Sequence, residues 1–200
     1  MLEGRDEGPG AQPAPTDDGE PAQRRLIGRI ALGDRRAFET FYRTYHVRVT
    51  RFLDRMMRRR SLVEEVLNDT MLVVWNRSER FDGSCKVSTW VFAIAYRRAL
   101  QALRRQDEAL EDETPDKRPA VGAGPEQQAQ TRQLNAQLGR ALDALSVDHR
   151  MVVELAYVHD MGYREIAQIV DCPVDTVKTR MFHARRRLRA LLAGNAEDWL

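Results

Sequence analysis

Few features of this sequence suit a metal centre, a disulfide scaffold or a membrane protein. The two cysteines, Cys85 and Cys172, lie far apart and belong to no CxxC or Cys/His motif. That spacing argues against a metal site and a disulfide framework, so we interpret both as structural thiols, with a redox switch as the alternative. No apolar run approaches the length of a membrane span, and the first residues lack the charged-then-apolar order of a signal peptide. We expect a cytoplasmic protein without a cofactor.

Catalytic and β-sheet signatures are absent as well. The histidines are scattered over helical segments, with no nucleophile or pair of carboxylates at matching spacing (His46, His149, His159 and His183). No stretch alternates apolar and polar residues convincingly enough to predict a strand, and no internal repeat is present. The sequence therefore predicts an all-α protein that is not an enzyme.

Charge is unevenly distributed, although the net charge of the chain is only +2. Residues 22–106 contain nineteen Lys or Arg against eight acidic residues, which gives +11. Residues 107–130 contain two basic residues against seven acidic ones, which gives −5. A strongly basic block flanked by acidic segments indicates a polyanionic partner.

Apolar residues at helical spacing divide the chain into two predicted domains. From about Arg24 to Met56 they predict one long helix or two closely joined helices, followed by helices at 62–76 and 88–105. The acidic, Pro- and Gly-containing stretch that follows is typical of a flexible linker. We predict two small helical domains on a flexible acidic linker, with these boundaries: a disordered tail at 1–23, an N-terminal domain at 24–106, the linker at 107–130, a helix-turn-helix domain at 131–193 and a tail at 194–200.

The most informative segment is a predicted helix-turn-helix over residues 163–192, in which Asp-Cys-Pro at 171–173 separates two helices. On the second helix, apolar residues recur at steps of three and four and form one face (Val174, Val177, Met181, Ala184, Leu188 and Leu191). The opposite face is polar, basic and aromatic (Asp175, Lys178, Thr179, Phe182, Arg186 and Arg189). A recognition helix in the major groove needs such a face, because cations contact phosphates or guanine and a ring contacts a thymine methyl group. An ordinary amphipathic helix with a solvated basic face is the alternative.

The predicted helix at 88–105 carries a second basic face. A helical wheel places four arginines and a glutamine within about 120° of one another, namely Arg97, Arg98, Gln101, Arg104 and Arg105. Trp90 and Ile94 continue this strip, and Tyr96 lies nearby. Such a strip suits a phosphate backbone, with aromatic rings stacking on unpaired bases. Trp90 and Ile94 fit a hydrophobic core as well.

The predicted helix at 62–76 is locally acidic within the basic domain. Glu64, Glu65 and Asp69 lie close to Leu72 and Trp75. Such a face repels DNA but suits a basic and partly apolar protein surface, with a merely solvated face as the alternative. The other side of this helix collects residues at core spacing (Val63, Val66, Leu67, Thr70 and Val74).

Three segments carry a family resemblance. The chain contains, in this order, VEEVLNDTMLVVW at 63–75, VSTWVFAIAYRRALQALRR at 87–105 and YREIAQIVDCPVDTVKTR at 163–180. Over about residues 24–192 it resembles a bacterial RNA polymerase sigma factor of the extracytoplasmic-function (ECF) group of the sigma-70 family. The resemblance implies a helical bundle like sigma region 2, followed by a helix-turn-helix domain like sigma region 4.

The resemblance also implies three contact surfaces. The 62–76 helix corresponds to the segment that binds the clamp helices of the largest subunit of core RNA polymerase, through Glu64, Glu65, Asp69, Thr70, Leu72 and Trp75. The loop at 81–86 and the next helix correspond to the segment that opens the −10 promoter element and binds its flipped bases, through Lys86, Trp90, Tyr96, Arg97, Arg98, Gln101, Arg104 and Arg105. The helix at 174–189 corresponds to the one that reads the −35 element, through Lys178, Thr179, Arg180, Phe182, His183, Arg185 and Arg186.

The implied function is promoter-specific initiation, with core RNA polymerase, promoter DNA and an anti-sigma factor as partners. One alternative is a sigma mimic that only titrates an anti-sigma factor, but its DNA-reading segments would lack basic residues. The other is a stand-alone helix-turn-helix regulator, which leaves the acidic helix unexplained. The sequence departs from the common family pattern at Asn68, Tyr96-Arg97, Gln101 and Asp175, and these departures bear on base preference.

Overall fold

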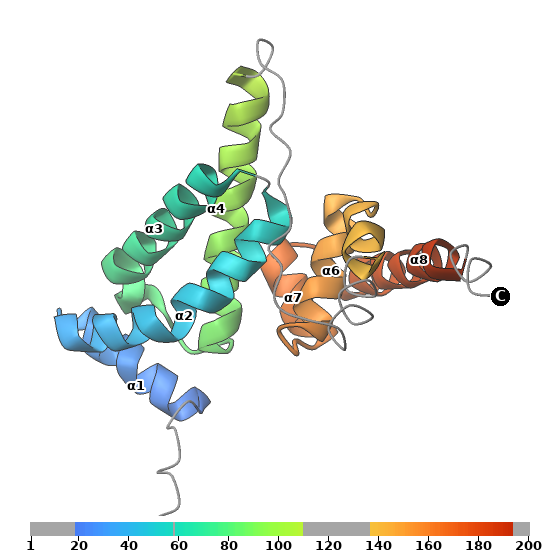
Figure 1. The fold of residues 1–200 in the computed structure, drawn as a ribbon. Coiled ribbons are helices and arrows are strands. Elements are labelled where there is room, and N and C mark those ends of the chain that lie inside the picture. The colour runs from blue at the N-terminus through green and yellow to red at the C-terminus, as the bar shows by residue number, and fades with distance from the viewer. Residues whose placement is uncertain (1–18, 58, 110–136, 194–200) are drawn as a thin grey trace, which may run out of the picture.

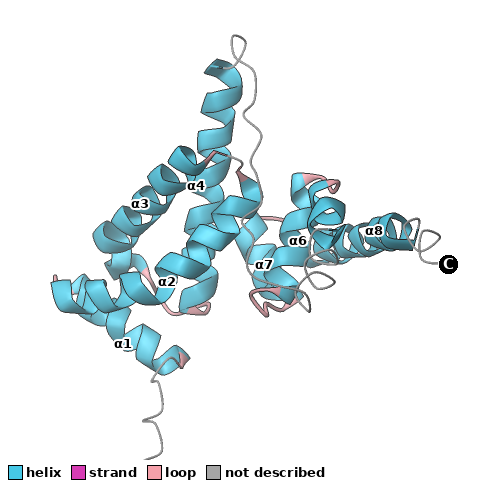
Figure 2. Cartoon of the chain, in the orientation of Figure 1, coloured by secondary structure: helices cyan, strands magenta, loops and turns pink. Residues whose placement is uncertain are grey.

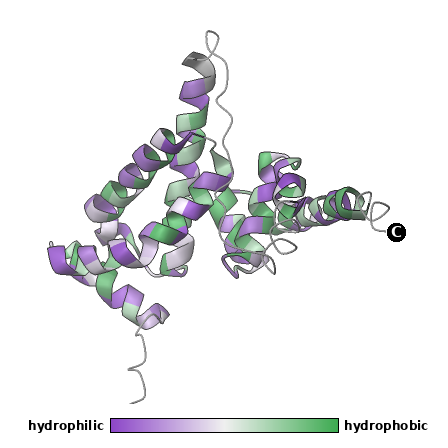
Figure 3. Cartoon of the chain, in the orientation of Figure 1, coloured by the Kyte–Doolittle hydropathy of each residue, from purple (hydrophilic) through white to green (hydrophobic). Residues whose placement is uncertain are grey.

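The computed structural model describes residues 19–57, 59–109 and 137–193, and its regular elements within these ranges are all helices (Figures 1 and 2). This confirms the predicted all-α class. The proposed linker lies almost entirely outside the described residues, as do the residues at 1–18 and 194–200. None of the helices in the described ranges is long and apolar enough to cross a membrane, and Figure 3 shows hydrophilic and hydrophobic residues mixed along them.

The N-terminal half begins with a pair of helices, α1 (Glu20–Ala31) and α2 (Arg35–Met56). Gly33 turns the chain between them at a φ of 82°, and the Asp34 carboxylate accepts hydrogen bonds from the amides of Arg36 and Ala37. The predicted boundary at 24 was too late, because α1 already starts at Glu20. Pro21 occupies its first turn, where a missing N–H costs nothing.

Two further long helices complete this half. They are α3 (Arg60–Arg77) and α4 (Val87–Ala109), joined through the short 3₁₀ turn η1 (Ser78–Arg80) and the loop at 81–86. The predicted helices at 62–76 and 88–105 are thus confirmed, with slightly longer ends. Large aromatic side chains on α2 and α4 fill the core of the bundle: Phe41, Tyr45, Phe52 and Phe92 are fully buried.

The C-terminal half consists of helical residues at 137–143, then α6 (Val147–Tyr157), α7 (Tyr163–Val170) and α8 (Val174–Ala193). Ser146 caps α6 by accepting a hydrogen bond from the His149 amide. After α7, Asp171 adopts a left-handed conformation with φ 51°, which ends that helix and turns the chain into α8. The predicted helix-turn-helix is therefore present in α7 and α8.

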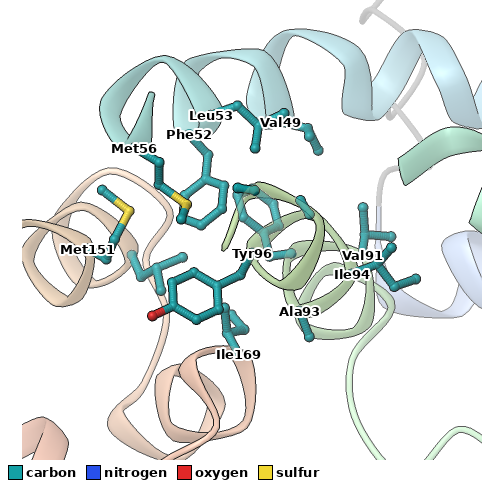
Figure 4. Close-up of a cluster of buried hydrophobic side chains, with 14 of the residues drawn as sticks. Val49, Phe52, Leu53, Met56, Val91, Ala93, Ile94, Tyr96, Met151 and Ile169 are labelled. Carbon is teal, nitrogen blue, oxygen red and sulfur yellow. The ribbon is translucent and has the colours of Figure 1, made fainter. Parts of the chain in front are cut away.

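The two halves share one continuous core. In Figure 4, side chains from α2 and α4 meet side chains from the C-terminal half, including Met151 on α6 and Ile169 on α7. Figure 1 shows α7 beside α4, whereas α8 extends away from the N-terminal helices. The sequence predicted two domains on a tether, and it did not predict that they would pack directly against each other.

Candidate nucleic-acid and protein interfaces

Helix α8 separates its residues into the two faces that the spacing predicted. Val177, Met181 and Ala184 are buried against the rest of the C-terminal half. On the opposite face the Phe182 ring is 63% exposed. Most of the predicted −35 residues are exposed with it: Lys178, Thr179, His183, Arg185 and Arg186. We call these six residues the α8 reading face.

Local contacts hold this face in shape. The Lys178 ammonium lies 2.8 Å from the Asp175 carboxylate, and their hydrogen bond lowers the pKa of Asp175. The Phe182 and His183 rings meet edge to face with centroids 5.4 Å apart. The Arg185 guanidinium lies 5.6 Å from the centroid of the Tyr157 ring. Both sides of the Asp175–Lys178 pair are exposed, so water and salt screen it and a competing anion readily replaces it.

Arg180 is placed differently from its predicted neighbours. Its guanidinium lies 2.7 Å from the Asp148 carboxylate on α6, and its side chain is only 23% exposed. A second nitrogen approaches the Cys172 sulfur at 4.0 Å. Arg180, one of the predicted −35 residues, thus joins α8 to α6 in this structure.

The arginines of α4 form an exposed strip, as the helical wheel predicted. Arg97, Gln101, Arg104 and Arg105 are exposed, and Arg98 is half-buried with its guanidinium 3.3 Å from the Gln101 oxygen. At the start of the helix, Trp90 packs against the core, and its ring lies 5.4 Å from that of Phe81 in the preceding loop. Trp90 is thus partly buried in the core, and the rest of its surface is accessible.

Tyr96 and Ile94 do not belong to this exposed strip. Tyr96 is 4% exposed and Ile94 is 8% exposed, and burial raises the pKa of the Tyr96 phenol. Figure 4 shows the Tyr96 ring between α4, Met151 and Ile169. In this arrangement Tyr96 is not accessible to DNA, because the C-terminal half covers that side of α4.

An acidic side chain from the helix-turn-helix closes over the start of α4. Glu165 on α7 lies 3.0 Å from the Lys86 ammonium and 3.3 Å from the Thr89 hydroxyl, which donates to it. Burial favours the neutral acid, but the hydrogen bond from the Gly162 amide and the contact with Lys86 outweigh it and lower the pKa of Glu165. The same contact raises the pKa of Lys86. A predicted −10 DNA contact is thereby neutralised within the chain.

The acidic side of α3 is largely open to a partner. Glu64 and Glu65 are exposed, Asp69 is half-buried, and Leu72 is 55% exposed. Trp75 is half-buried, with its ring against that of Phe38 at a centroid distance of 5.2 Å. These positions leave a ridge of carboxylates around an exposed apolar side chain.

Thr70 is the member of the predicted polymerase set that this ridge excludes. It is fully buried, and its hydroxyl donates a 2.7 Å hydrogen bond to the Val66 carbonyl one turn earlier. The prediction that Thr70 contacts a partner is therefore wrong. Its spacing with the apolar residues of α3 had already indicated the buried side, and the role implied by the resemblance conflicted with it.

Sequence reasoning missed two groups of residues. Glu20 and Arg24 on α1 contact the loop at 81–86 and the start of α4, although Glu20 had been assigned to the tail. His159, one of the scattered histidines, packs against Phe52 and Phe92 of the N-terminal half. Only the four-residue spacing of Glu20 and Arg24 gave a local signal; the contacts themselves join segments far apart in sequence.

Comparison with known proteins places these features in one family. Residues 41–109 match Sigma-70 region 2, and residues 135–188 match Sigma-70, region 4. The chain is 33% identical over 160 residues to the ECF RNA polymerase sigma factor RpoE of Cereibacter sphaeroides, an alignment that covers 78% of this chain and 86% of that protein.

Two solved structures are similar in fold. A structure of CnrH in complex with the cytosolic domain of CnrY gives a TM-score of 0.65 at 23% identity, covering 87% of this chain and 99% of that one. A structure of the sigma factor RpoE in complex with the anti-sigma factor NepR from Bartonella quintana gives 0.62 at 22% identity, covering 78% and 96%. Taken with the two matched regions and the relative above, the order of acidic helix, basic helix and helix-turn-helix has one explanation: the chain belongs to the ECF group of the sigma-70 family of RNA polymerase sigma factors.

Proposed function

We propose that this protein binds core RNA polymerase, directs it to promoters by reading their −35 and −10 elements, and promotes opening of the −10 element. The observation that carries the proposal is the α8 reading face, where Phe182 stands 63% exposed among cations on a helix whose other face is buried. Isolated core enzyme holds DNA mainly through phosphates and without regard to sequence. Two separate sequence-reading surfaces on one chain supply what it lacks.

The α8 reading face is suited to duplex DNA. Arg185 and Arg186 meet phosphates and fix the helix in the major groove, while Lys178 and Thr179 reach base edges. The Phe182 ring makes apolar contact with a thymine methyl group. Asp175 restrains Lys178 through their hydrogen bond, and its carboxylate can accept a hydrogen bond from a cytosine amino group.

The loop at 81–86 and α4 are suited to a separated strand. Arg97, Arg104 and Arg105 follow the phosphate backbone, and Gln101 offers an amide to bases. The half-buried Phe81 and Trp90 rings at the start of the helix provide stacking surfaces, each stacked base being worth about 1–3 kcal/mol. Binding of flipped bases there offsets the cost of unpairing them.

The acidic ridge of α3 is suited to the polymerase. Glu64, Glu65 and Asp69 complement a basic surface, and Leu72 fills an apolar contact at its centre. Asp69→Ala is expected to lower affinity for core polymerase about tenfold, in the range of charge pairs at interfaces, without changing the thermal unfolding temperature. Thr70→Ser, which keeps the internal hydroxyl, is the matched control and should bind core normally.

Promoter opening requires the two halves to separate. In the structure the Glu165 carboxylate forms an ion pair with the Lys86 ammonium, and the C-terminal half covers Tyr96. The Glu165 carboxylate neutralises the Lys86 ammonium and so weakens its attraction for a DNA phosphate. We therefore assign the described arrangement to a closed form in which Tyr96 is covered, Lys86 is neutralised and the −10 element is not opened. The CnrH and RpoE structures were both solved with a second protein bound, the latter an anti-sigma factor. An anti-sigma factor that stabilises the closed form would keep this protein inactive.

Run-off transcription with purified core enzyme and a promoter library tests the proposal directly. The full chain should select a family of sequences with two conserved elements at fixed spacing. A protein that only titrates an inhibitor would bind the inhibitor but give no transcripts, and a stand-alone regulator would bind DNA without affinity for core. Either result would overturn the proposed function.

A further inference from the structure

A pair of charged residues on α1 reaches across the molecule to the loop that the proposed function assigns to −10 bases. Glu20 and Arg24 are one helical turn apart, and the Arg24 Nε donates a 2.8 Å hydrogen bond to Glu20 Oε1. Both side chains make further contacts. Each also bonds to backbone near residues 83–87, about sixty positions later in the sequence.

Arg24 holds the loop by its carbonyl groups. One terminal nitrogen donates to the Gly83 oxygen at 3.1 Å and the other to the Cys85 oxygen at 3.0 Å. The guanidinium also lies 5.8 Å from the centroid of the Phe81 ring. Because the guanidinium is planar and rigid, its two hydrogen bonds to the loop fix both the position and the orientation of the loop backbone.

Glu20 holds the point where the loop becomes α4. Its two carboxylate oxygens lie 3.1 and 3.2 Å from the Val87 amide, which donates to them. That amide is the first of the helix and has no partner within it, so a carboxylate there satisfies the donor and interacts favourably with the helix dipole. Arg24 keeps the carboxylate in place, so the two residues act as one unit.

We propose that Glu20 and Arg24 form a positioning dyad that sets the conformation of the loop at 81–86 before promoter DNA arrives. The inference rests on the proposed function of that loop. Without the dyad the loop must be ordered at the moment of base capture, and this ordering reduces the net free energy of binding. Charge-assisted hydrogen bonds to backbone are strong enough to prevent that loss. The dyad acts through the loop and does not itself contact bases.

Gly83 provides an independent view of the same contact. It has a φ of 76°, and a Cβ atom placed on it would lie 2.7 Å from the Arg24 nitrogen that bonds its carbonyl. An alanine at this position therefore strains the backbone and also pushes Arg24 away. If the dyad sets the loop, the effects of Gly83→Ala and Arg24→Ala on −10 opening should be strongly non-additive.

The test uses full-length protein in holoenzyme and follows the opening of a −10 element that carries a fluorescent base analogue. Arg24→Ala should slow opening about tenfold and weaken discrimination among single-base variants of the element, because the loop loses its preset shape. Glu20→Gln should have a smaller effect, and Arg24→Lys should restore part of the rate. Arg43→Ala on α2 is the matched control. Arg43 pairs with Glu39, four positions earlier on the same helix, so this variant also removes an arginine from an ion pair but leaves the loop at 81–86 untouched.

The controls separate positioning from folding and from the proposed function. Affinity for core and for −35 duplex should stay within about twofold in Arg24→Ala, since neither surface includes the loop. Unchanged opening and base preference in Arg24→Ala would overturn the inference, as would equal losses in all three assays. If wild-type holoenzyme opens no promoter, the proposed function fails, and hydrogen exchange at the Val87 amide decides the dyad alone: faster exchange in Arg24→Ala supports it and unchanged exchange rejects it.

Discussion

The two proposed DNA-reading surfaces differ in how accessible they are in the same structure. The α8 reading face is open, with Phe182 63% exposed and a charge pair between Lys178 and Asp175 made within the helix. The surface on α4 is partly covered, because Tyr96 is buried and Lys86 is paired with Glu165 from α7. The proposed −35 surface is therefore accessible in the closed form, whereas part of the proposed −10 surface is covered.

The difference lies in where the neutralising carboxylate comes from. Asp175 belongs to the same helix as Lys178, so its contact links no separate parts of the fold. Glu165 belongs to the other half of the molecule, and its contact with Lys86 forms only when the halves are together. One helix of the C-terminal half thus presents the proposed −35 surface, while its neighbour covers part of the proposed −10 surface. In the proposed function, separation of the halves is the step that couples the two elements.

The largest expected effect comes from removing a side chain of the covered α4 surface. Tyr96→Ala should lower the free energy of unfolding by about 3 kcal/mol, because a buried aromatic ring is removed from the contact between the halves. Denaturation by guanidinium chloride measures this loss. Arg97→Ala, one position along and exposed, is the control and should change stability by less than about 0.5 kcal/mol. Equal stability of Tyr96→Ala and wild type would mean that the ring is not buried. The contrast between a covered α4 surface and an open α8 surface would then be wrong.

Removing a side chain of the open α8 surface should affect DNA binding rather than stability. Phe182→Ala is expected to weaken −35 duplex binding by about 1–2 kcal/mol, the range for loss of a good base contact. Its thermal unfolding should match that of wild type, since the ring contributes nothing to the core. Leu192→Ala removes an exposed apolar side chain farther along α8 and should bind normally. A sharp fall in stability with intact specific binding would place Phe182 in the core instead.

The smallest expected effect is a dependence of closure on pH. His159 packs against Phe52 and Phe92, and burial, reinforced by Arg48 and Arg51, lowers its pKa to about 4. Above the ordinary value of 6.5 the side chain is neutral in both forms, so its titration has no effect there. As pH falls from 6.5 towards 4, only the open form takes up a proton, and closure weakens.

Scattering measurements on the full chain can detect this opening. The radius of gyration should rise between pH 7.5 and pH 5, and His159→Phe, which cannot titrate, should suppress the rise. Glu154, whose pKa is raised by burial, takes up a proton first in the closed form and so opposes the effect. The same increase in both proteins would assign the opening to other groups and remove His159 from the account.

The sequence predicted the local features of the molecule well and the contacts between its halves poorly. The faces of α8 were predictable because three- and four-residue spacing within one helix determines which side is apolar. The burial of Tyr96 was not, because it depends on Met151 and Ile169, which belong to the other half. Thr70 shows the opposite case: its own spacing predicted burial correctly, and the role implied by family resemblance did not.

Glu20 shows why the edge of a predicted domain is hard to locate. It ends an acidic, Pro- and Gly-rich stretch, so composition assigned it to the tail. Its structural role depends on the Val87 amide, and a carboxylate that satisfies a distant backbone donor leaves no periodic pattern in the sequence. The dyad with Arg24 could be found only from the three-dimensional contacts.

The account depends most on the closed form being unable to open the −10 element, and a zero-length cross-link tests that claim directly. Lys86 and Glu165 are close enough for a carbodiimide to join them through an amide, and the other lysines of the sequence are Lys117 and Lys178. Lys86→Arg protein, treated identically, keeps any link within α8 but cannot form this one. Untreated Lys86→Gln measures the effect of losing the charge alone.

After treatment, wild type and Lys86→Arg should bind −35 duplex equally well. Holoenzyme containing the linked wild-type protein should fail to open the −10 element, whereas treated Lys86→Arg and untreated Lys86→Gln should still open it. Opening by the linked protein at the rate of the unlinked one would contradict the account, because promoter melting would then proceed with the two halves held together.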